Sequence, residues 1–215
     1  ASLMGSTNQR WDKYNYINDI YSKVASGSGM SLKGGLSRKV NMAISIYANA
    51  AFYSRVPYSN LYFSSGNNNI TSNVKNEHNI LAEIGFRHLF QKGSVEVNLY
   101  YAKWKNKSII SNRYKQPDET FNRYMVTGLD ALHTGVEITA SYKPTRVIEV
   151  NAFIGIGDWK WKNDVSASIY DPYSGLLAQE INVYSKDLPV GDAPQTQLSV
   201  SVSVNALPNL QLNGE

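Results

Sequence analysis

Between Gln195 and Asn205 the sequence QTQLSVSVSVN alternates without error between polar and apolar residues. Successive side chains of a β-strand point to opposite faces, so this segment predicts one strand with a face of Leu and Val and a face of Gln and Ser. Two folds satisfy such a strand. A soluble β-sandwich turns the valines into its core, whereas a membrane β-barrel turns them toward lipid and the serines toward a wet lumen.

The same alternation recurs along most of the chain. Apolar residues recur at every second position over most of the stretches 30–38, 41–53, 79–90, 94–104, 135–143 and 148–159, and almost no segment has a helical period. This pattern predicts an all-β, antiparallel fold of about nine strands. No run of about 18 apolar residues is present, which excludes a membrane-spanning helix but leaves a barrel open, because half of a barrel strand is polar.

Strand and loop lengths favour the barrel. The alternating segments run about nine to eleven residues, enough to cross a bilayer when tilted, while sandwich strands more often have about five or six. Short and long connections follow one another in strict order: the short ones are Arg38–Asn41, Gln91–Gly93, Pro144–Arg146 and Asn205–Asn209, and the long ones are Asp12–Gly29, Val56–Glu77, Lys107–His133 and Lys162–Ala193. Outer-membrane barrels have short periplasmic turns and long extracellular loops. We therefore expect transmembrane strands whose valines face lipid.

Composition narrows the function. The chain has 15 Tyr and 4 Trp against 6 Phe, which suits the aromatic girdles of membrane barrels and also sugar-stacking sites. Its net charge of +4 is scattered along the sequence without a basic run, which argues against nucleic acid as a partner. It contains no Cys, so disulfides, thiolate metal sites and thiol nucleophiles are excluded.

The barrel is expected to be incomplete within residues 1–215. An unpaired strand edge in hydrocarbon leaves backbone groups without hydrogen bonds, so membrane barrels close. The last strand has hardly begun at the final LNGE, and Glu215 is not the aromatic residue on which such barrels generally end. We expect strands of a larger barrel to be missing on both sides of this segment.

Four stretches resemble, in order and spacing, the C-terminal barrel half of TonB-dependent outer-membrane receptors. They are YSRVPYSNLYF (Tyr53–Phe63), NVKNEHNILAEIGFRH (Asn73–His88), TGLDALHTGVEITASYKP (Thr127–Pro144) and VGDAPQTQLSVSVSV (Val190–Val204), with Asn76 where proline is usual in the family. The resemblance implies a roughly 22-stranded barrel with a plugged lumen that imports a scarce nutrient by TonB-coupled active transport. The plug and the barrel-closing strands would lie outside residues 1–215.

The resemblance also implies the partners and the location. It implies contact with TonB through the plug, with outer-membrane lipid and with a small nutrient ligand, at the outer membrane of a bacterium. A surface lipoprotein is a further partner that it leaves open. It implies no cofactor.

Aromatic residues gather at the extracellular ends of the polar strand face. Tyr53, Trp104, Trp159 and Trp161 share the inward parity, and Tyr58 and Tyr62 follow in the loop after Tyr53. Such rings can stack on a solute above the plug, or they can pack the strand extensions and loops together. Both interpretations stay open at this point.

Five charged residues also have the inward parity: Glu83, Arg87, Glu96, Glu137 and Glu149. They either contact a plug or solute, or form a wall of paired, hydrated charges. No catalytic constellation stands out, since no serine lies in G-x-S-x-G and the three His residues lack paired metal-ligand spacing. We expect a receptor segment that is not an enzyme and holds no metal; a passive porin-like barrel and a soluble carbohydrate-binding β-sandwich are the alternatives.

Overall fold

The computed structural model describes residues 1–11, 20–63, 68–71, 74–110, 114–115, 121–171, 177–191, 193–207 and 210–214. Nearly all of the regular structure is antiparallel β-sheet, with one short helix, α1 (Ser59–Tyr62). The all-β antiparallel prediction is therefore confirmed. The described part of the chain has no helix that is long and apolar enough to cross a membrane.

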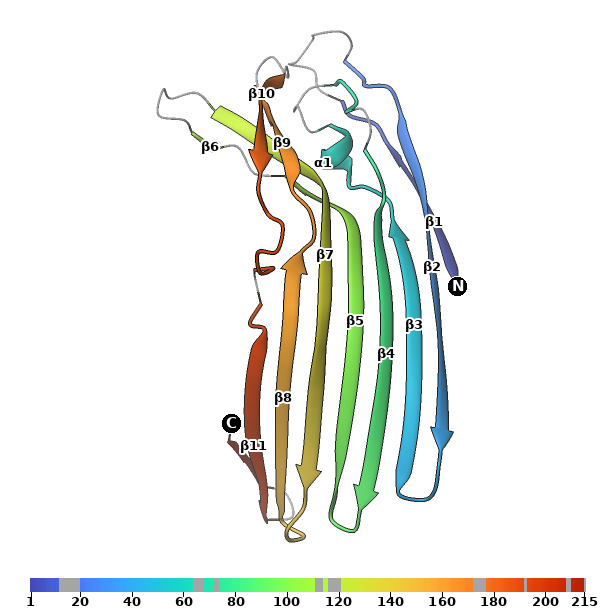
Figure 1. Ribbon diagram of the computed structural model, residues 1–215, viewed down its shortest axis with the longest axis vertical. Coiled ribbons are helices and arrows are strands. Elements are labelled where there is room, and N and C mark those ends of the chain that lie inside the picture. The colour runs from blue at the N-terminus through green and yellow to red at the C-terminus, as the bar shows by residue number, and fades with distance from the viewer. Residues whose placement is uncertain are drawn as a thin grey trace.

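The long strands form an up-and-down meander in the order β1-β2-β3-β4-β5-β7-β8-β11-β12 (Figure 1). Their bounds are β1 (Ser2–Asn8), β2 (Ala25–Lys39), β3 (Ile44–Arg55), β4 (Glu77–Phe90), β5 (Gly93–Ile110), β7 (Phe121–Tyr142), β8 (Ile148–Trp161), β11 (Thr196–Leu207) and β12 (Leu210–Gly214). Within the described residues no pairing joins β1 to β12, so both are edges of an open sheet.

The short turns lie together at one end of the sheet, here called the short-turn end, and the long connections lie at the other, the loop end (Figure 1). Side chains close two of the turns. Asn41 Oδ1 accepts hydrogen bonds from the backbone N–H of Ala43 and Ile44, both at 2.8 Å, and Thr145 Oγ1 accepts from Ile148 N at 3.1 Å. Asn and Thr side chains stabilise tight turns in this way. Residues 208–209, inside the fourth predicted turn, lie outside the described residues.

Three of the predicted long loops overlap strands, which corrects the sequence-based boundaries: β2 begins at Ala25, inside the loop predicted at 12–29. β5 and β7 pair as far as Ile110 and Met125, so most of the connection predicted at 107–133 is a strand extension. The predicted loop 162–193 holds β9 (Val165–Tyr170) and β10 (Leu177–Val183), which pair with each other. β9 also pairs with β7, and the short β6 (Tyr114–Lys115) pairs with the start of β7.

The alternation of apolar and polar residues did not predict these strand extensions, because the β5–β7 ladder is irregular where it leaves the long sheet. The register shifts between Trp104 and Lys107 and again before Ile109. Asn106 (φ 56°) and Gly128 (φ 79°) have left-handed backbone conformations there. A bulge sets two residues opposite one and so reverses the parity of the residues beyond it. A period of two therefore no longer identifies the strand.

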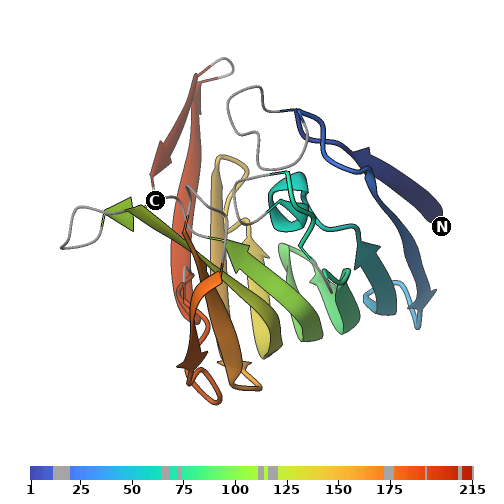
Figure 2. The same ribbon diagram turned by 90° about the horizontal axis from the view of Figure 1, so that it is seen from above.

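The sheet is curved, and its concave face is the polar one. Figure 2 shows α1 on the concave side of the curve. A Cβ atom at Gly27 would lie 2.7 Å from the Tyr62 hydroxyl of α1, so Gly27 faces the concave side. Gly27 has the parity of Ser31, which pairs with Tyr53. The face of Tyr53 is therefore concave and the face of the valines is convex.

The convex face carries exposed aliphatic side chains, and among the described residues no buried cluster covers it. We call its residues the apolar band: the outward positions of 32–36, 44–52, 80–86, 95–101, 136–142, 148–156 and 198–204. Leu36 is 82% exposed, Leu198 74% and Ile84 58%. The buried clusters lie at the loop end instead, one around Ala25, Tyr62 and Phe63 and one around Val126, Leu129 and Ala167.

Candidate functional site

Strand register brings the predicted inward residues onto the concave face. Glu83 pairs with Tyr100 and Arg87 with Glu96 across β4 and β5. Across β7 and β8, His133 pairs with Trp159 on the same face. Tyr53, Trp104, Trp161, Glu137 and Glu149 share that face by the same pairings. The parity assigned from the sequence is therefore the one the sheet has.

Near the short-turn end the inward charges are paired with one another. Arg87 Nε donates to Glu96 Oε2 at 2.7 Å, and the Tyr47 hydroxyl donates to Glu96 Oε1 at 2.9 Å. Lys143 Nζ lies 3.1 Å from Glu149 Oε2. For Arg87, Glu96 and Glu149 these contacts correspond to the wall of paired charges that the sequence left open, whereas Glu137, within the described residues, accepts only from the Asn98 amide, at 3.5 Å.

A cavity opens on the concave face between β2, β3 and β4. Its volume is about 440 Å³, within the usual range of ligand pockets. The inward residues that line it are Lys33, Gly35, Asn49, Ala51, Tyr53, Leu81 and Glu83. We call it the β2–β4 pocket. The small residues Gly35 and Ala51 leave room for the cavity. The amine of Lys33, the carboxylate of Glu83, the amide of Asn49 and the phenol of Tyr53 line it.

The hydrogen bonds that Glu83 accepts in the β2–β4 pocket are long. Asn49 Nδ2 donates to Glu83 Oε2 at 3.4 Å, and the Tyr47 hydroxyl reaches Glu83 Oε1 at 3.5 Å. Both contacts are long for hydrogen bonds. A polar solute could therefore take over the carboxylate of Glu83 at little cost.

An aromatic cluster of Tyr100, Trp104, His133 and Trp159 lies on the concave face of β5, β7 and β8, nearer the loop end. The His133 ring centroid is 4.6 Å from that of Trp104 and 5.5 Å from that of Trp159. Trp159 Nε1 donates to the Tyr100 hydroxyl at 2.8 Å. The Nζ of Lys107 is 4.0 Å from the Trp104 ring centroid, a cation–π distance.

His133 is held neutral inside this cluster. His133 is only 9% exposed, and its buried Nδ1 has no hydrogen-bond partner among the described residues. Burial lowers the pKa of His133, and repulsion from Lys107 lowers it further, against a hydrogen bond with the Ala102 backbone. From the sequence, His133 was considered only as a possible metal ligand. Its position between two tryptophans depends on the β5–β7–β8 register, which no local motif encodes.

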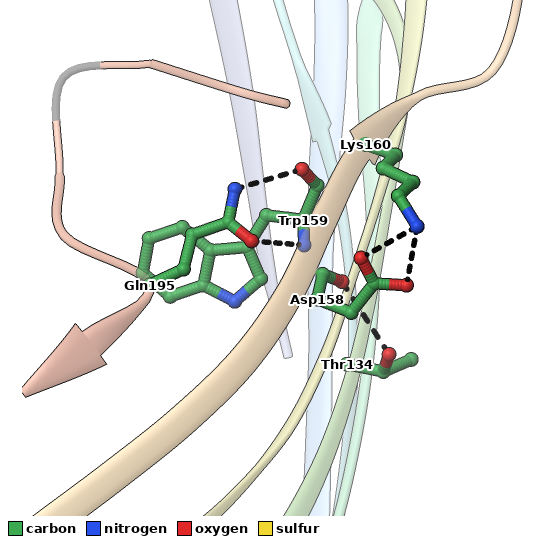
Figure 3. A network of polar contacts seen from close by, with 5 residues as sticks. All are labelled: Thr134, Asp158, Trp159, Lys160 and Gln195. Carbon is green, nitrogen blue, oxygen red and sulfur yellow. Dashed lines mark hydrogen bonds and ion pairs between the residues drawn. The ribbon is translucent and has the colours of Figure 1, made fainter. Parts of the chain in front are cut away.

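On β8 the convex face changes from apolar to polar next to Trp159, and Figure 3 shows Asp158 and Lys160 in contact there. Ile156 is the last apolar outward residue of β8, and Asp158 and Lys160 follow it on the same face. Lys160 Nζ lies 2.9 Å from Asp158 Oδ1, and this contact raises the pKa of Lys160. Thr134 Oγ1 donates to the Asp158 carbonyl at 3.4 Å. On β7 and β8, His133 and Trp159 therefore lie beyond the end of the apolar band.

Gln195 fastens β8 to the start of β11 at that level (Figure 3). Its Oε1 accepts from Trp159 N at 3.0 Å, and its Nε2 donates to the Trp159 carbonyl at 3.1 Å. The side-chain amide thus acts as one more residue of the strand ladder. It fixes the backbone from which the Trp159 ring enters the aromatic cluster.

The remaining predicted aromatic residues are not gathered with the cluster. Trp161 packs against Val126, Leu129 and Ala167. Tyr62 is 8% exposed and packs with Ala25 and Phe63, so it is closed to a solute in this conformation. Tyr58 is exposed, and its hydroxyl accepts a hydrogen bond from Arg55 Nη1 at 2.8 Å. Packing explains Trp161 and Tyr62, and only Tyr53, Trp104 and Trp159 line candidate binding surfaces.

The described residues contain no group of three His, Asp or Glu side chains placed to hold a metal ion. Comparisons with protein families, curated proteins and solved structures give no match to this chain.

Proposed function

We propose that this chain is part of an outer-membrane β-barrel receptor that binds a scarce nutrient and imports it by TonB-coupled transport. The observation that carries the proposal is the apolar band exposed on the convex face, opposite a concave face of charged, amide and aromatic side chains. A β-barrel in a bilayer needs this distribution, whereas a soluble sandwich needs the valines covered by a second sheet.

The dimensions of the apolar band support a bilayer. In β8 the band runs from Ile148 to Ile156, a segment about 28 Å long at the usual rise per strand residue. A tilt of about 40° reduces its height to about 22 Å, close to the apolar height of about 25 Å in outer-membrane barrels. Soluble monomers rarely expose contiguous apolar patches beyond about 600 Å².

The open sheet edges support a larger barrel. β1 pairs only with β2 and β12 only with β11 in the described sheet, so each leaves one edge unpaired, and unpaired backbone groups are costly in hydrocarbon. We propose that further strands close the barrel. The resemblance of the four sequence motifs to TonB-dependent receptors is what links this barrel to a plug, to TonB and to active import.

The solute would bind on the concave face. The β2–β4 pocket offers Lys33, Glu83 and Tyr53, and the aromatic cluster offers flat rings of Trp104 and Trp159 nearer the loop end. This combination suits a polar solute with hydroxyl groups or charges and at least one flat or ring-shaped face. The paired charges near the short-turn end are left to shape the lumen.

Membrane placement is tested with spin labels on single-cysteine variants, which the cysteine-free chain permits directly. Val200 and Ser201 are neighbours on β11 that point to the convex and concave faces. In lipid vesicles, labelled Val200→Cys should collide more often with oxygen, which concentrates in lipid, than with a water-soluble nickel chelate. Labelled Ser201→Cys should show the reverse preference. If the Val200→Cys label is shielded from both reagents, the valines form a protein core and the proposal fails.

Energy coupling is tested separately in cells. A deletion strain and its complemented counterpart are compared for uptake of ferric chelates, corrinoids and oligosaccharides, with and without a protonophore. Receptor-dependent uptake that the protonophore abolishes is expected. Uptake that persists without proton-motive force would instead indicate a passive barrel.

A further inference from the structure

The short-turn end of the sheet is strongly basic. The last two residues of β2 and the turns between β4 and β5 and between β7 and β8 carry five cations and no carboxylate. We call these residues the basic rim: Arg38, Lys39, Lys92, Lys143 and Arg146. Only Lys143 has an ion pair in the described part of the chain, with Glu149. The rim therefore keeps an excess of positive charge that the fold itself does not neutralise.

Three of these cations surround a cavity. A volume of about 540 Å³ lies between the β4–β5 and β7–β8 turns, lined by Gln91, Lys92, Ser141, Lys143, Thr145 and Arg146. Lys92 Nζ donates to the Pro144 carbonyl at 2.9 Å, which ties the two turns together. The cavity thus brings together the ammonium groups of Lys92 and Lys143, the Arg146 guanidinium and the Thr145 hydroxyl. Glu149 accepts from Ser141 at 3.3 Å and pairs with Lys143, so Lys92 and Arg146 are the cations without a carboxylate partner in the described part of the chain. These are the donors that bind phosphate oxygens.

Apolar side chains project beside the basic rim. Met42 is 100% exposed, and Val40, Leu89, Phe90 and Val147 are also exposed at this end. Cations next to exposed apolar side chains suit the boundary between lipid headgroups and acyl chains, where the apolar groups enter the hydrocarbon and the charges reach phosphate. A soluble acidic protein partner would use the charges but would leave this apolar fringe without a role.

We propose that the basic rim binds the phosphate headgroup of an anionic phospholipid in the leaflet on the short-turn side, with the cavity between Lys92 and Arg146 as the headgroup site. This inference rests on the proposed membrane placement. Under that placement the short turns lie at the periplasmic surface, so the lipid belongs to the periplasmic leaflet. The bound lipid anchors the turns and sets the depth of the barrel.

Native mass spectrometry of the detergent-solubilised protein tests the site. The probes are phosphatidylglycerol and phosphatidylcholine with identical acyl chains, compared for the wild type, the Lys92→Gln/Arg146→Gln variant and the matched Lys23→Gln/Lys105→Gln control. Lys23 and Lys105 are exposed cations outside the basic rim. Each cation near a membrane surface favours anionic lipid about fivefold. The rim variant should therefore lose roughly 25-fold in preference for phosphatidylglycerol, and the control should keep it.

The other outcomes separate this site from the membrane placement. Equal phosphatidylglycerol preference in the rim variant and the wild type overturns the site, while the spin-label result at Val200 still decides the placement. Displacement of the lipid by millimolar glycerol 3-phosphate or inorganic phosphate would assign the cavity to a soluble phosphate and overturn the lipid assignment. Retained lipid under that competition, lost only in the rim variant, supports the proposal.

Discussion

At the scale of single residues, glycines make room for aromatic rings on the concave face. The ring of Tyr100 lies across Gly135 of the neighbouring strand, and the Trp159 indole lies close to Gly157. A Cβ atom at Gly135 would lie 2.5 Å from Tyr100 Cζ and 2.6 Å from the carbonyl oxygen of Ile156. The ring could move, but the backbone oxygen belongs to the paired strand β8. The aromatic cluster therefore depends on the absence of a side chain at Gly135.

We expect Gly135→Ala to destabilise the protein by about 1–3 kcal/mol, the usual cost of overpacking. The matched control is Gly34→Ala in β2, where a Cβ atom meets nothing within 4 Å. Urea unfolding of the vesicle-embedded protein, followed by tryptophan fluorescence, measures both variants. A Gly135→Ala protein as stable as the Gly34→Ala protein would mean that the strands are not in this close contact.

His133 predicts a pH dependence of stability. Its pKa is lowered by burial between the tryptophans and by Lys107, so the unfolded chain binds the proton more readily than the folded one. The contribution of neutral His133 is intact above the unfolded pKa of about 6.5, and it is lost as the pH falls from there toward the lower folded value. His133→Gln should flatten this acid-side loss. Unfolding midpoints at pH 8 and at pH 5 measure it, and an unchanged pH dependence in His133→Gln would contradict the assignment.

The sequence predicted which face each of these residues occupies but not which of them touch. Parity along a strand comes from local alternation, so Tyr53, Trp104 and Trp159 were assigned inward correctly. The contacts of His133 depend on the register in which β7 pairs with β5 and β8, and no residue pattern within one strand specifies that register. Trp161 has the same parity as Trp159, yet it packs against β9, a strand that the sequence pattern did not indicate.

At the scale of strands, Gln195 lies just before β11 and continues the pairing with β8 through its side chain. The two hydrogen bonds from its side-chain amide hold the Trp159 backbone where β11 has not yet begun. Gln195→Ala should leave the Trp159 N–H without this acceptor. A neutral hydrogen bond contributes about 1 kcal/mol net, so local opening at Trp159 should become several-fold more frequent.

Hydrogen exchange measures this local effect. In Gln195→Ala, amide protection should fall within the upper part of β8 around Trp159 and stay unchanged near Ile148, at the other end of the strand. Ser199→Ala is the matched control, because Ser199 has the same inward parity on β11 and pairs with Phe153 within the regular ladder. Equal protection at Trp159 in both variants would show that backbone pairing alone holds this segment.

The extensions of β5 and β7 at the loop end are strands that the alternation of residues in the sequence did not predict. The alternation of β3, and that of β8 as far as Ile156, was readable because both faces are continuous over those lengths. Beyond Trp104 the register shifts, and positive φ at Asn106 and Gly128 reverses the inside–outside order within a few residues. The strands β9 and β10 are short, with six and seven residues, and the pairing of β9 with β7 is non-local.

At the scale of the whole molecule, the arrangement of apolar surface is the reverse of that in a soluble domain. Its buried clusters are small and lie at the loop end, while Leu36, Ile84, Leu99, Ile156, Leu198 and Val200 are exposed on the convex face. Full burial of one such side chain contributes about 1.5–3 kcal/mol, so these six alone represent about 10 kcal/mol. That equals the net stability of a typical domain, about 5–15 kcal/mol. We therefore expect an apolar medium or surface to cover the band in the functional state.

If lipid is the cover, the folded protein should depend on an amphiphile. We expect the purified protein to be monodisperse in detergent and to aggregate when the detergent is diluted below its critical micelle concentration. An unheated sample on a denaturing gel should migrate differently from a boiled one, because a sheet whose strands are all hydrogen-bonded resists the gel detergent until heated. A monodisperse protein in plain buffer would require a second apolar surface over the valines. In that case the β2–β4 pocket and the aromatic cluster would face water on a soluble binding module, and polysaccharide would become the first ligand to try.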